Sequence, residues 1–100
     1  MNMKDLMAQA TQMQSRMKKE MAEFDVKVFE YTYQNAISVL IKGSFQILEI
    51  KILDESLIDA SDKETLQAII ATACNQAING VVKGKNDLAN NLAPGLSNLI

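Results

Sequence analysis

The hydrophobic and polar positions of residues 3–24 repeat with the period of an α-helix. Apolar side chains recur at steps of three and four residues, at Met3, Leu6, Ala10, Met13, Met17, Met21 and Phe24. This spacing puts them on one stripe and predicts a helix over 3–24, a range without Pro or Gly. A helix of about 20 residues is roughly 30 Å long. The core of a 100-residue chain does not cover such a helix fully, so we expect a second chain or a ligand to use it.

Three strand patterns follow, over residues 26–33, 36–42 and 45–53. The first is rich in β-branched and aromatic residues, and its apolar phase slips between Val28 and Phe29. The slip predicts a β-bulge there, or a strand that passes between two environments. The third is apolar on both faces, which predicts the most buried strand, lying between the chain's own helices and a second subunit.

A second long helix is expected from Ser61 to about Ala89, before Pro94 ends the pattern. Ser61 and Glu64 have the spacing of a capping box. Gly80 and Gly84 are expected to weaken the helix by up to about 1 kcal/mol each. The predicted fold is α+β, in the order α-β-β-β-α, with a three-stranded antiparallel sheet between two long helices and dimerisation through the sheet. Residues 1–93 form the domain, and 94–100 form a C-terminal tail that is ordered only if its leucines find a groove.

Charge is distributed unevenly, although the net charge is only −2. Residues 1–19 hold four basic residues and one acid, whereas residues 49–64 hold six acids and two lysines. Such a polarised molecule can meet a polyanion at one end. The single cysteine, Cys74, forms no intrachain disulfide and suits a reducing cytoplasm. No stretch approaches the roughly 18 apolar residues of a membrane span, so no membrane association is expected.

The chain offers little for catalysis. It has no His, and it shows no Gly-rich phosphate loop, serine elbow or CxxC motif. Cys74 has no basic neighbour in sequence and is expected in the core. The acids of residues 54–64 fit no EF-hand spacing and predict a solvated turn. We therefore expect no enzyme activity, no cofactor, no metal site and no small-molecule substrate.

Two surfaces of the first helix leave alternatives open. Lys4, Arg16, Lys18 and Lys19 fall on the side away from the apolar stripe. They form either a solvated face or a binding face, to which Lys83 and Lys85 of the second helix can add. The methionines of the stripe either pack against the chain itself and a partner helix, or offer an adaptable binding surface.

Four short segments resemble motifs of one family. They are Leu6–Gln14 (LMAQATQMQ), Ile50–Leu57 (IKILDESL), Ala73–Ala77 (ACNQA) and Leu92–Leu96 (LAPGL). Their order and spacing resemble the YbaB/EbfC family of nucleoid-associated proteins, which shows LMKQAQQMQ, VEIDPSLL, AAFNDA and LPPGF. The resemblance covers nearly the whole chain. One departure is residues 29–39 (FEYTYQNAISV), which contain no glycine, where the family has a Gly-rich hairpin.

The resemblance implies a small bacterial, cytoplasmic homodimer that binds double-stranded DNA in the nucleoid with projecting helices. Phosphate contacts are then expected from Lys4, Arg16, Lys18 and Lys19, with Lys83 and Lys85 secondary. Because no Arg or Asn is well placed for base edges, we expect weak sequence preference. The glycine-free hairpin predicts longer, stiffer strands and an altered approach to DNA. The alternative is a dimeric protein-interaction scaffold that does not bind DNA directly.

Overall fold

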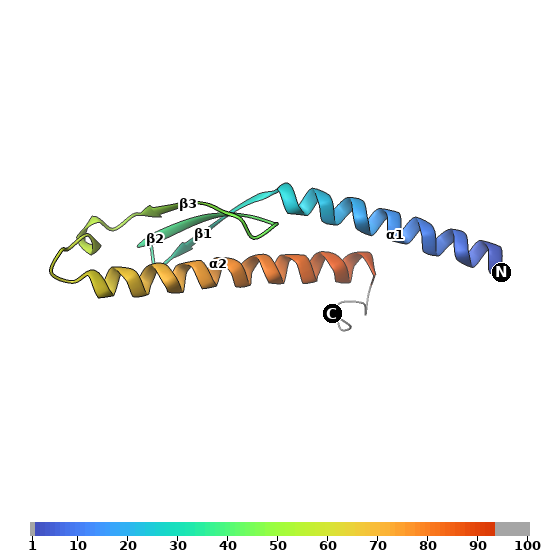
Figure 1. Ribbon diagram of the computed structural model, residues 1–100. Coiled ribbons are helices and arrows are strands. Elements are labelled where there is room, and N and C mark those ends of the chain that lie inside the picture. Colours follow the sequence, from blue (N-terminus) through green and yellow to red (C-terminus); the bar gives the residue numbers. More distant parts are fainter. Residues whose placement is uncertain (1, 94–100) are drawn as a thin grey trace.

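A computed structural model describes residues 2–93 and shows an elongated molecule with extents of 71 × 22 × 16 Å. The elements are α1 (Met3–Val26), β1 (Val28–Tyr33), β2 (Ile37–Lys42), β3 (Ile47–Ile52), a short 3-10 turn (Glu55–Leu57) and α2 (Lys63–Leu92). Figure 1 shows α2 running beneath the sheet and on alongside α1. The predicted α-β-β-β-α order is confirmed. In space, however, α1 lies beyond the end of the sheet, and it is α2 that covers a face of it.

The sheet is an antiparallel meander in the order β1-β2-β3, as predicted. β1 and β2 pair in continuous register from Val28↔Lys42 to Tyr33↔Ile37, without the bulge predicted at residues 28–29. The apolar phase slips there because α1 continues to Val26 and the strand begins only at Val28. A register irregularity lies instead at Leu40/Ile41, in the ladder between β2 and β3.

The hairpin between β1 and β2 turns without glycine. Gln34 and Asn35 have positive φ values of 49° and 54°, and the Ala36 N–H donates to the Tyr33 carbonyl over 2.8 Å. Two successive positive φ values are typical of the tight turns that join twisted strands, where Asn and Gly are favoured. Gln34 and Asn35 therefore form this tight turn without glycine. Each flanking strand is six residues long.

The hydrophobic core lies between α2 and the first two strands. Ile37, Val39 and Ile41 of β2 are fully buried. They pack in one cluster with small side chains of α2, chiefly Ala73, Ala77 and Val81. The alanines bring the helix axis close to the sheet. Gly80 continues this face of α2, and a Cβ atom there would overlap the Tyr31 ring of β1, so this glycine is a packing site as well as a weak helix former.

β3 is not the most buried strand, so that prediction is wrong. It is one of the two edge strands of the sheet, and Ile47, Leu48 and Ile50 are 37%, 45% and 39% exposed. The central strand β2 holds the core instead, because α2 lies over β1 and β2 and leaves β3 uncovered. Phe45 lies outside the strand, in the turn after β2, with φ of 71°.

The acidic connection to α2 is shaped by side-chain caps that differ from the predicted capping box. Asp62, not Ser61, caps α2, since its carboxylate accepts from the Thr65 N–H at 3.3 Å and the Thr65 hydroxyl at 2.7 Å. Ser61 instead donates its N–H and hydroxyl to Asp59, and these hydrogen bonds lower the pKa of Asp59. Asp and Ser are both favoured N-cap residues, and the negative charge of Asp62 also interacts favourably with the N-terminus of α2.

Gly43 fixes where the sheet meets α1, and its replacement tests the junction. A Cβ atom at Gly43 would overlap the backbone carbonyl of Phe24, which has no rotamer to escape to. We expect Gly43→Ala to lower the free energy of unfolding by about 2–3 kcal/mol, as overpacking does, in urea titrations followed by circular dichroism. The matched control is Ser44→Ala at the exposed next position, where we expect a change within about 0.5 kcal/mol. Equal stability of the two variants would contradict this packing.

Candidate nucleic-acid interface

Arg16, Lys18 and Lys19 lie within one turn of α1, on the part of the helix that extends beyond the sheet. All three are exposed. Within residues 2–93, none of them forms an ion pair. Their charges are therefore available to an external anion, and the helix holds them at a fixed spacing.

The three cations are spread around the helix and do not form a single row. Two residues turn an α-helix by about 200°, so Arg16 and Lys18 lie on opposite flanks, about 160° apart. Lys19 lies between those flanks, on the face away from the apolar stripe. An α-helix with cations on both flanks can meet two strands of negative charge at once.

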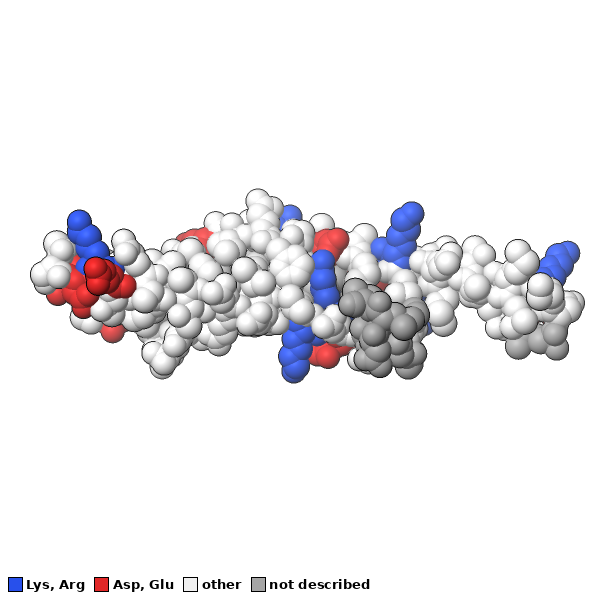
Figure 2. Space-filling view, turned by 60° about the horizontal axis from the view of Figure 1, so that its bottom comes forward, with Lys and Arg blue, Asp and Glu red and all other residues white. Residues whose placement is uncertain are grey.

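Lys4 is exposed on the same element but stands apart from the other three. The twelve residues from Lys4 to Arg16 span about 18 Å along a helix. The structure therefore places a cluster of three cations and one distant cation on α1, rather than a set of four. Figure 2 shows basic side chains at separated places along the molecule, a group of acidic side chains at the end opposite α1, and further acidic side chains near the middle.

Lys83 and Lys85 of α2 have different surroundings. Lys83 is exposed. Lys85 pairs with Asp25 at the end of α1, with Nζ 3.0 Å from Oδ1, and its side chain is only 29% exposed. Its Nζ also lies 4.8 Å from the centroid of the Phe45 ring and 5.9 Å from that of Phe24. Lys85 therefore joins α1, α2 and the turn after β2, and its charge is largely committed within the chain.

The sequence did not reveal this junction, because its members are distant along the chain. Asp25 and Lys85 are sixty positions apart, and only the antiparallel packing of α1 on α2 brings them together. Lys27, an exposed lysine directly after α1, was not among the predicted contacts. Its place in the sequence shortly after Lys18 and Lys19 was the available signal.

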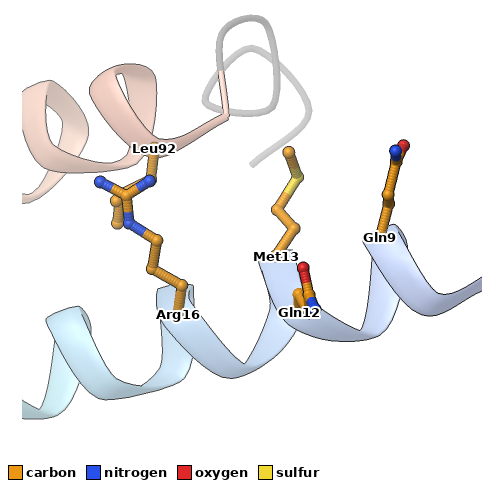
Figure 3. A pocket seen from close by; sticks show the side chains of 5 residues that line it. All are labelled: Gln9, Gln12, Met13, Arg16 and Leu92. Carbon is orange, nitrogen blue, oxygen red and sulfur yellow. The ribbon is translucent and has the colours of Figure 1, made fainter.

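An open groove of about 350 Å³ lies beside the basic cluster. It is lined by Gln9, Gln12, Met13 and Arg16 of α1 and by Leu92 at the end of α2. Figure 3 shows the Arg16 side chain reaching toward Leu92, while Met13 and Gln9 point from α1 to the same side. These five lining residues combine amide groups, one cation and apolar walls, and they include no nucleophile or carboxylate.

Other site chemistry is sparse in the described residues. Between residues 2 and 93, no three His, Cys, Asp or Glu side chains group as they would to hold a metal ion. Over the same range no helix is long and apolar enough to cross a membrane. Cys74 is a free, half-buried thiol that packs against the core.

A family comparison fits this arrangement. The model of the YbaB/EbfC DNA-binding family matches residues 1–96. The chain belongs to this family. It is a family of non-enzymatic, nucleoid-associated DNA-binding proteins, so the predictions of the family and of no enzyme activity are confirmed.

Individual YbaB/EbfC relatives cover most of the chain. A nucleoid-associated protein of Malacoplasma penetrans is 36% identical over 94 residues, which is 94% of this chain and 99% of the relative. One of Ureaplasma urealyticum is 34% identical over 94% of both chains. A nucleoid-associated protein of Clostridium kluyveri is 41% identical over 78 residues, covering 77% of this chain and 68% of the relative.

The different surroundings of Lys83 and Lys85 predict different effects on stability. We expect Lys85→Ala to lower the free energy of unfolding by about 1–2 kcal/mol, because it removes two cation–π contacts and leaves a shielded Asp25 oxygen without its partner. The matched variant Lys83→Ala should change it by less than about 0.5 kcal/mol. Thermal and urea unfolding measure both, and indistinguishable variants would contradict the structural role of Lys85.

Proposed function

We propose that this protein binds double-stranded DNA as a homodimer, mainly through phosphate contacts and with weak sequence preference, as a nucleoid-associated protein of the cytoplasm. The observation that carries the proposal is the cluster of Arg16, Lys18 and Lys19. These side chains are exposed and free of ion pairs within residues 2–93, on a helix that lies beyond the end of the sheet. Membership of the YbaB/EbfC DNA-binding family supports duplex DNA as the polyanion.

The spread of charge around α1 suits a helix between two phosphate strands. The major groove of B-DNA is about 12 Å wide and admits an α-helix. A helix placed there presents its flanks to the two backbones, and Arg16 and Lys18 occupy opposite flanks. Lys19 and Lys4 then face the DNA, while the apolar stripe faces the protein. Lys83 is a secondary contact. Lys85 contributes less because Asp25 neutralises it.

Weak sequence preference follows from the side chains available. Lysine and arginine on phosphates position a protein without reading sequence. The face of α1 between the flanking cations carries small or uncharged residues, among them Ala8, Thr11 and Ser15. The Thr11 hydroxyl already donates to the Met7 carbonyl of its own helix over 2.9 Å. Close approach to the duplex is thus possible without strong base-specific hydrogen bonds.

A salt titration of DNA binding tests the phosphate contacts. Affinity for a duplex should fall linearly on a double logarithmic plot as salt rises, because phosphate binding releases counterions. Replacing Arg16, Lys18 and Lys19 by Ala should flatten the slope by about 0.9 for each phosphate that the binding unit no longer neutralises. Replacement of Lys42, Lys51 and Lys63 removes the same charge on the sheet and at the start of α2, and should flatten the slope less. Equal slopes for both triple variants would refute the site, and no binding at low salt would favour the scaffold alternative.

A homodimer is supported by the uncovered edge of the sheet. Ile47, Leu48 and Ile50 expose apolar side chains on β3, and Leu53 beyond it is 49% exposed. An edge strand also leaves one row of backbone N–H and C=O groups unpaired. A second copy would cover this surface and double the number of cations that one binding unit brings to DNA.

Light scattering tests the dimer and its surface. The unaltered protein should show twice the 11.1 kDa chain mass at low micromolar concentration. We expect Ile50→Lys to shift the mass toward the monomer, because it places a charge in the proposed interface. Val82→Lys is the matched control at a similarly exposed apolar residue on α2, 41% exposed, and should stay dimeric. A folded monomer of the unaltered chain would refute the dimer.

A further inference from the structure

Gln12 lies on the side of α1 that carries the exposed cations. Lys19 follows it by seven residues, which is about 20° short of two helical turns, and Arg16 follows it by four residues, about 40° beyond one turn. Lys18 lies about 120° away, on the other flank. Gln12 is therefore placed between the two basic flanks and faces away from the apolar stripe.

The surroundings of Gln12 leave its amide group open. Every residue of α1 from Asn2 to Arg16 is exposed. In the described part of the chain no hydrogen bond engages the Gln12 side chain, and the predicted C-terminal tail, residues 94–100, lies outside that part. The neighbours of Gln12 on this side of the helix are Ala8 and Ser15, which are both small. A second molecule can therefore approach Gln12 closely.

The side chain of Gln12 offers chemistry that the surrounding cations lack. A glutamine amide has one carbonyl acceptor and two N–H donors. Adenine presents the complementary pair in the major groove, with N7 as acceptor and the N6 amino group as donor, so that one glutamine can bind both. Thr11 lies on the same side, but its hydroxyl already donates to the Met7 carbonyl. The hydroxyl of a serine such as Ser15 does not discriminate between bases.

We propose that Gln12 reads one adenine of the bound duplex, with the N6 amino group donating to Oε1 and Nε2 donating to N7. This contact rests on the proposed function, in which α1 lies in the major groove between two phosphate strands. Arg16 and Lys18 then hold the helix at the phosphates, and Gln12, about one turn before Arg16, meets the base edges. One such contact gives about tenfold discrimination at one position, which agrees with a weak sequence preference overall.

Selection from a library of random duplexes tests this contact in the full chain. The unaltered protein should enrich adenine about tenfold at one position of the bound sequence. Gln12→Ala should remove this enrichment and leave the affinity for unselected duplexes and its salt slope unchanged, because an uncharged side chain releases no counterions. The matched control is Gln14→Ala, which removes the same side chain about 160° away around α1 and should keep the enrichment.

Replacement of the adenine N7 atom by carbon gives a second readout. A duplex with 7-deazaadenine at the enriched position keeps its base pair but lacks the acceptor that Gln12 would use. The unaltered protein and Gln14→Ala should bind it about fivefold more weakly than the unmodified duplex, because one hydrogen bond is lost. Gln12→Ala should bind both duplexes equally, as expected when both changes remove the same interaction.

The outcomes separate this contact from the proposed function. Loss of adenine enrichment in Gln12→Ala but not in Gln14→Ala, with the matching loss of sensitivity to 7-deazaadenine, supports the contact. A library in which no position favours adenine, or an enrichment that persists in Gln12→Ala, overturns it while DNA binding itself stands. Absence of binding at low salt would refute the proposed function, and the base contact with it.

Discussion

The position of α1 depends on the burial of one ring, that of Phe24. Phe24 is 7% exposed at the end of α1 and packs on Gly84 of α2, on Gly43 after β2 and on the Phe29 ring of β1, 5.2 Å away. A Cβ atom at Gly43 would overlap the Phe24 backbone, and one at Gly84 would make a tight contact with the Phe24 ring. Lys85 closes the same junction by pairing with Asp25. This contact region therefore helps to hold the cations of α1 in place relative to the sheet.

Both the sheet and α1 are covered by α2 over only part of their length or width. α2 covers β1 and β2 and leaves β3 exposed, and the C-terminal half of α1 packs on α2 while its N-terminal half does not. A 100-residue chain cannot cover two long helices and a sheet by itself, since small chains bury a smaller share of their surface. The uncovered parts include apolar side chains, and to the exposed surface of β3 we assign a second copy.

Three basic residues cluster at positions 16–19 of α1, and six acids lie in residues 49–64, before and at the start of α2. The acidic connection of residues 54–64 lies at one end, where its carboxylates cap backbone N–H groups, and the projecting part of α1 lies at the other. This separation explains how a protein with a net charge of −2 presents a cationic element to a polyanion. The local field at one end, rather than the net charge, governs an encounter with DNA.

The sequence by itself determined the order of elements, the two long helices, the turn at Gln34-Asn35 and the family. Each of these depends on local patterns, namely the helical period of apolar residues, the alternation in strands and short motifs. It did not determine which strand holds the core, because Phe45–Leu53 is as apolar as a core strand and only the path of α2 leaves β3 uncovered. Nor did it show that Lys85 is committed to Asp25 while Lys83 is exposed, since both lysines look alike on a helix. Those distinctions arise from contacts between residues far apart in the chain, and these exist only once α1, α2 and the sheet have packed together.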